Sequence, residues 1–107
     1  MKSIRPFLNL LNSILDEAVN EEARAQNGNS RWGERELKNI VIPEMNELKL
    51  HADRGDVYYK YGKKHKYGKK QRMLESTYLI TDSLNALDRT SLGRKIILLQ
   101  DMYNAFL

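Results

Sequence analysis

The chain of 107 residues is 41% hydrophobic and 30% charged, with a formal net charge of +4. This length suits one domain with one core, which we assign to residues 1–107, and the apolar content excludes an intrinsically disordered chain. The absence of cysteine excludes disulfides, a thiolate nucleophile and cysteine-based metal centres.

The N-terminal sequence imitates a signal peptide, because Lys2 and Arg5 precede an apolar stretch. Asn9 and Asn12 interrupt that stretch, acidic residues follow from Asp16 onward, and no small-residue cleavage site is present. No other run reaches the ~18 apolar residues that a membrane helix requires. We therefore expect a cytoplasmic protein that begins at its own initiator methionine and has no membrane partner.

The first predicted helix spans residues 6–26, where apolar side chains recur at helical offsets and Pro6 suits the first turn. It should end at the sequence Asn-Gly-Asn-Ser of residues 27–30. In this turn Gly28 can adopt a left-handed backbone conformation without a steric penalty.

The second helix is predicted over residues 31–52, with Asn29 or Ser30 as its cap. Its acidic residues, Glu44 among them, are expected on a solvated face. Pro43 lacks a backbone N–H and clashes with the preceding helical turn, at a cost of ~3 kcal/mol. We therefore expect a kink or a break near this proline.

The third helix is predicted over residues 72–87, after the sequence Asp-Arg-Gly-Asp of residues 53–56 has ended the second. Its apolar stripe continues to Leu84 and Leu87 and is widened by Tyr78.

The fourth helix is predicted over residues 90–106, with Asp88, Thr90 or Ser91 as its cap. Four amphipathic helices with short connections predict an all-α fold, a small antiparallel bundle with a basic loop or helix entry at residues 57–71.

Two features suggest a protein interface. The fourth helix has a second apolar side, which indicates either a central helix or a homodimer contact. The single tryptophan either packs against the end of the bundle or serves as an exposed anchor for a partner. The candidate interface residues are Trp32, Leu98, Met102 and Leu107.

The strongest functional signal is the basic segment KYGKKHKYGKKQR at residues 60–72, which holds seven of the 18 lysine and arginine residues and no acid. The other residues carry 11 basic and 14 acidic side chains, so the positive net charge comes from this segment alone. Lysines attract phosphate, and interleaved tyrosines can stack on unpaired bases. The candidate polyanion-binding residues are Tyr58, Tyr59, Lys60, Tyr61, Lys63, Lys64, Lys66, Tyr67, Lys69, Lys70 and Arg72.

Two other interpretations of this segment remain open. Lysine-rich loops are commonly solvated surface. The lysines can also meet an acidic protein surface, such as a partner or the acid patch of the first predicted helix, which holds Asp16, Glu17, Glu21 and Glu22.

Known catalytic and metal-binding patterns are missing from the sequence. There is no nucleophile elbow, phosphate-binding loop or dinucleotide fingerprint. The offsets of Glu44, Glu47 and His51 permit a metal site, but a solvated charged face is the better interpretation. We expect a noncatalytic regulatory or accessory protein, with no cofactor and no metal, that binds a polyanion such as nucleic acid. The alternative is a protein interaction module, for example an inhibitor or immunity-type protein.

Overall fold

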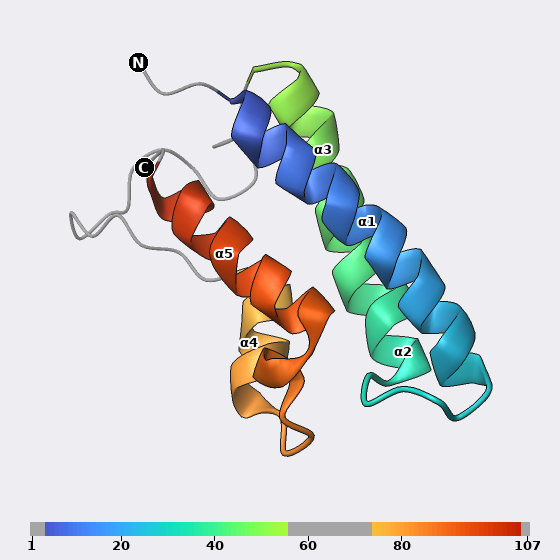
Figure 1. Ribbon diagram of the computed structural model, residues 1–107. Coiled ribbons are helices and arrows are strands. Elements are labelled where there is room, and N and C mark those ends of the chain that lie inside the picture. Colours follow the sequence, from blue (N-terminus) through green and yellow to red (C-terminus); the bar gives the residue numbers. More distant parts are fainter. Residues whose placement is uncertain (1–3, 56–73, 106–107) are drawn as a thin grey trace.

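A computed structural model describes residues 4–55 and 74–105, and all regular structure within these residues is helical. Figure 1 shows α1 and α3 as one long antiparallel hairpin, with α5 and the short α4 packed beside it. The predicted all-α bundle is confirmed. None of the helices in the described residues has the length and apolar content to cross a bilayer.

The helix α1 spans Arg5–Gln26 and has a proline in its first turn, as predicted. It ends where Gly28 adopts a left-handed conformation with φ of 74°. The Asn29 N–H then donates to the Arg24 carbonyl at 2.9 Å, which satisfies a carbonyl left over at the helix end.

The second predicted helix begins later than expected, at α2 (Glu34–Glu36), with Gly33 at its N-cap position and no side-chain cap. The capping prediction for Asn29 or Ser30 is therefore wrong. Ser30 instead accepts a hydrogen bond from the Trp32 N–H at 3.0 Å and donates its hydroxyl proton to Glu21. The Ser30 hydroxyl is therefore engaged in a local turn and does not cap α2.

A kink or a break was expected near Pro43, but the helix continues without a break and has a π-helical turn just before the proline. The segment η1 (Leu37–Val41) is a π-helix and leads directly into α3 (Ile42–Asp53). The Ile42 N–H donates to the Leu37 carbonyl, five residues back. Pro43 has no N–H, and its ring crowds the preceding turn, so the wider π-helical turn accommodates it. The segments η1 and α3 continue as one helix in Figure 1.

The third predicted helix is shorter than its apolar stripe suggested. The helix α4 spans Glu75–Asp82, and Ser83 beyond it is extended. A turn with Ala86 in the left-handed region leads into the 3₁₀ helix η2 (Leu87–Arg89). Leu84 is fully exposed and Tyr78 is 53% exposed, so their assignment to a buried stripe is wrong.

The last helix, α5, spans Ser91–Ala105 and agrees with the prediction. Thr90 is its capping residue, because its Oγ1 accepts a hydrogen bond from the Gly93 N–H at 3.0 Å.

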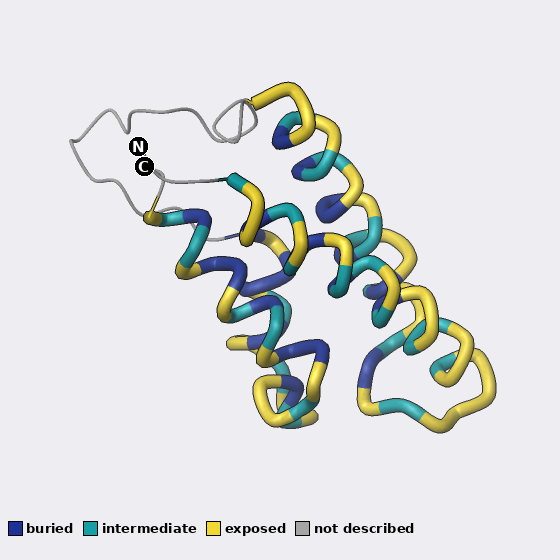
Figure 2. Tube along the Cα trace, turned by 45° about the horizontal axis from the view of Figure 1, so that its top comes forward, coloured by how far each residue is buried: buried dark blue, intermediate teal, exposed yellow. Residues whose placement is uncertain are grey.

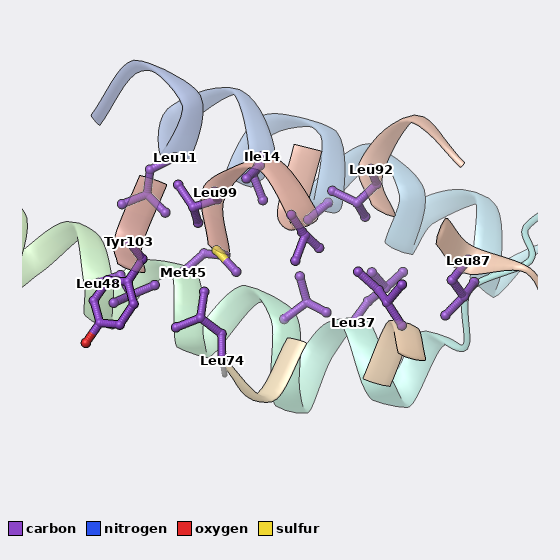
Figure 3. Close-up of a cluster of buried hydrophobic side chains, with 14 of the residues drawn as sticks. Leu11, Ile14, Leu37, Met45, Leu48, Leu74, Leu87, Leu92, Leu99 and Tyr103 are labelled. Atoms are coloured by element: carbon purple, nitrogen blue, oxygen red, sulfur yellow. The ribbon is translucent and has the colours of Figure 1, made fainter. Parts of the chain in front are cut away.

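The core lies between α1, α3 and α5, with α4 closing one side (Figure 2). Figure 3 shows Leu11 and Ile14 of α1 pointing toward Leu99 of α5 and Met45 of α3. At one end of the core, the ring centroids of Phe7 and Tyr103 lie 6.4 Å apart. The buried apolar residues are Phe7, Leu11, Ile14, Ala18, Trp32, Leu37, Val41, Met45, Leu48, Ala52, Leu74, Ile80, Leu87, Leu92, Ile96, Leu99 and Tyr103.

Candidate functional site

The predicted polyanion-binding residues of segment 58–72 lie outside the described residues, as does the interface candidate Leu107. The structure describes the two residues that border this part of the chain, Gly55 at the end of α3 and Leu74 at the start of α4. The two attachment points, Gly55 and Leu74, are the described residues next to the candidate site.

The first attachment point is the C-terminal end of α3. The Arg54 N–H donates to the His51 carbonyl at 3.1 Å, and the Gly55 N–H donates to the Ala52 carbonyl at 2.9 Å. Gly55 has φ of 79°, a conformation that glycine adopts without the strain a side chain would add. The chain thus leaves α3 through a left-handed turn at the predicted place, anchored by the buried Ala52.

The second attachment point is held by a buried glutamine of α5. The Leu74 N–H donates to Oε1 of Gln100 at 2.7 Å, and the Thr77 hydroxyl donates to the same oxygen at 2.9 Å. The side chain of Leu74 is fully buried, and Gln100 is only 6% exposed. The chain therefore enters α4 at a fixed point in the core.

A buried glutamate of α3 completes this attachment. Oε2 of Glu44 accepts a hydrogen bond from the Glu75 N–H, and its Oε1 accepts one from the Ser76 N–H, both at 2.8 Å. Amide groups in the first turn of a helix have no partner within the helix, and α4 has no side-chain cap of its own. Glu44 thus caps α4 from another helix, where the positive end of the helix dipole also favours its charge. We call Glu44 and Gln100 together the clamp.

The prediction that Glu44 belongs to a solvated face is wrong, since the residue is only 2% exposed. The sequence did carry a signal for its burial. Glu44 lies three residues after Val41 and four before Leu48, so it occupies the apolar stripe of its helix. Among the described residues, no three histidine, aspartate or glutamate side chains lie together in a way that could hold a metal ion.

Two acidic side chains of α1, Glu17 and Glu21, contact polar groups of the bundle itself. Glu17 accepts hydrogen bonds from Lys95 at 2.8 Å and from the Ser91 hydroxyl at 3.2 Å. Glu21 accepts the Ser30 hydroxyl and pairs with Arg24 at 3.5 Å. These residues line an open polar cleft of about 650 Å³ between α1 and the start of α5. The charged residues that line the cleft are three acidic and three basic ones: Asp16, Glu17, Glu21, Arg24, Arg31 and Lys95.

The described interface candidates differ in exposure. Trp32 is 3% exposed, and its indole N–H donates to Thr90 Oγ1 at 3.2 Å, so the ring belongs to the bundle and offers no exposed anchor. Met102 packs partly buried against the core. Leu98 is 52% exposed and is the member of this set that remains available to a partner.

Comparisons of the chain with protein-family models, with curated proteins and with solved structures find no match.

Proposed function

We propose that the protein is a noncatalytic regulatory or accessory protein that binds a polyanion, specifically nucleic acid, through the basic segment 58–72. The distribution of charge carries this proposal. Residues 60–72 hold seven basic side chains and no acid, whereas the described residues hold 10 basic and 13 acidic side chains. A polyanion is attracted to the segment and repelled by the remainder of the molecule.

The chemistry of the segment favours single-stranded nucleic acid over other polyanions. Its lysines neutralise phosphates, and stacking of a base on an aromatic ring contributes ~1 to 3 kcal/mol in single-strand binders. Four of the six tyrosines lie at positions 58, 59, 61 and 67, among these lysines. An acidic protein surface would use the lysines but gain nothing from base stacking.

Fluorescence anisotropy with labelled single-stranded RNA, single-stranded DNA and duplex DNA tests the proposal. Wild-type protein should bind the single strands more tightly than the duplex. Replacement of Lys63, Lys64, Lys69 and Lys70 by glutamate should abolish binding without altering the helical circular-dichroism spectrum.

A matched control variant distinguishes the effect of the segment on binding from the effect of the protein's net charge. Replacement of four exposed basic residues of the bundle by glutamate changes the net charge by the same amount: Arg35, Lys38, Arg89 and Arg94. This control should retain most of the binding. Equal losses in both variants, or wild-type binding that survives the reversal in the segment, would reject the proposed site.

A further inference from the structure

The turn that ends α1 contains a chemically reactive pair of residues, Asn27 and Gly28, and both are exposed. Asparagine is a thermolabile residue. The backbone nitrogen of the residue that follows it can attack the side-chain carbonyl carbon, Cγ. Glycine hinders this attack least, because it has no Cβ. No other asparagine of the chain precedes a glycine, so the reaction is expected at this position first.

The folded turn holds the two reacting groups apart. Asn27 has ψ of 6°, which turns the Gly28 nitrogen away from the Asn27 side chain, so a ring cannot close without rotation about the Cα–C bond. The Gly28 N–H also donates to the Ala25 carbonyl at 3.1 Å, which keeps the proton on the nitrogen that has to attack. The Asn29 N–H, bonded to the Arg24 carbonyl, closes the same turn. The reaction therefore requires the last turn of α1 to open.

One side-chain contact ties the chain beyond this turn back to α1. The Ser30 hydroxyl donates to Oε1 of Glu21. Residues 26–29 are exposed, so burial of apolar surface does not oppose local opening between these two anchors. The space around Gly28 is also open to water, since nothing lies within 4 Å of the position that a Cβ would take there. The hydrogen bond from Ser30 to Glu21 thus helps to hold the turn closed.

We propose that Asn27 is a site of spontaneous deamidation, and that the turn ending α1 controls its rate. When the turn opens, the Gly28 nitrogen gives up its proton and bonds to Cγ of Asn27. The side-chain nitrogen takes up a proton in exchange and leaves as ammonia. Water then adds to one of the two carbonyl groups of the resulting succinimide and breaks the bond from that carbon to nitrogen. The products are aspartate and isoaspartate, and the only co-reactant is water.

The products change the end of α1. Isoaspartate lengthens the backbone by a methylene group and so does not fit the native turn. Both products add a carboxylate at the C-terminal end of the helix, where the helix dipole disfavours negative charge. The residues that follow, Asn29 and Ser30, line the open polar cleft between α1 and the start of α5. Deamidation therefore favours the open form of the turn irreversibly and alters one wall of this cleft.

Incubation of the folded, full-length protein at neutral pH tests the site. Trypsin cleaves after Arg24 and Arg31, so one peptide of residues 25–31 contains both Asn27 and Asn29. Mass spectrometry with fragmentation should locate aspartate and isoaspartate at position 27, with little conversion at Asn29. The substitution Asn27→Gln should remove this product. An unmodified peptide, or conversion at Asn29 as fast as at Asn27, would overturn the site.

Two matched variants test whether the turn controls the rate. Glu21→Ala removes the acceptor of the Ser30 hydroxyl and should raise the rate at Asn27 about fivefold, the change in an opening equilibrium expected from the loss of one hydrogen bond. Glu22→Ala removes the same charge one residue further along α1 and should leave the rate unchanged. Wild-type protein unfolded in concentrated urea should react faster than folded wild type. Equal rates in the two variants, or in folded and unfolded wild type, would overturn control by the turn.

Discussion

Gly93→Ala should destabilise the protein, although alanine is the better helix former. Gly93 is buried in the first turn of α5, beside the 3₁₀ helix η2. A Cβ at this position would overlap the carbonyl oxygen of Leu87 and lie 2.8 Å from its carbonyl carbon and 3.0 Å from Thr90 Oγ1. Backbone atoms, which cannot rotate away as a flexible side chain can, would have to move.

The size of the effect follows from the contacts that meet at Thr90. Its hydroxyl donates to the Leu87 carbonyl, and its oxygen accepts the N–H groups of Gly93 and of the Trp32 indole. Overpacking of this kind costs about 2 kcal/mol, and loss of the cap costs about 1 kcal/mol more. The higher helix propensity of alanine returns about 1 kcal/mol. The free energy of unfolding should therefore fall by about 2 kcal/mol.

Urea and thermal unfolding followed by tryptophan fluorescence measure this loss, because the single tryptophan is buried at the affected junction. A loss of about 2 kcal/mol lowers the Tm by roughly 8 °C in a domain of this size. Gly28→Ala is the matched control: nothing lies within 4 Å of the added Cβ, so only the strain of φ at +74° remains, about 1 kcal/mol. A Gly93→Ala variant as stable as wild type would refute the packing described for this junction.

Further predictions concern the third and fourth predicted helices. Leu87→Ala should lower the free energy of unfolding by about 2 to 5 kcal/mol, because this side chain is 2% exposed, whereas Leu84→Ala should change it by less than about 0.5 kcal/mol. If the two substitutions lowered the free energy of unfolding equally in urea titrations, this result would contradict the end of α4 at Asp82. Leu98→Lys should leave the mass measured by light scattering unchanged across concentrations, since one half-exposed leucine falls far short of the roughly 800 Å² per partner of a stable interface. A lower mass for the variant would support the homodimer.

The sequence predicted α1 and α5 closely because their signals are local. Both have long apolar stripes, and both end or begin at residues whose conformation depends on near neighbours, such as Gly28 and Thr90. The sequence also indicated that Pro43 affects the helix near it, since a proline affects its own helical turn, but the expected break is not present. The π-helical turn at Leu37–Val41 was not predicted.

The errors occurred where distant contacts decide the structure. Leu84 continues the apolar spacing of the third predicted helix, but the helix has already ended before Ser83. The spacing of apolar residues alone does not indicate where a helix ends. Glu44 caps a helix that begins 31 residues later in the chain. The candidate binding residues could be proposed from composition because they are adjacent in sequence. The clamp could not, because Glu44 and Gln100 lie on two separate helices, α3 and α5, and accept backbone N–H groups at the start of a third, α4.

The salt dependence of binding to a single-stranded RNA tests polyanion binding by segment 58–72 most directly. Each neutralised phosphate contributes about 0.7 to the slope of log K against log salt for single strands. If four to seven basic residues of the segment engage phosphates, anisotropy titrations between about 50 and 200 mM salt should give a slope between about −3 and −5. The control with Arg35, Lys38, Arg89 and Arg94 reversed should retain that slope. A wild-type slope near zero, or no binding at the lower salt concentration, would contradict nucleic-acid binding by the segment.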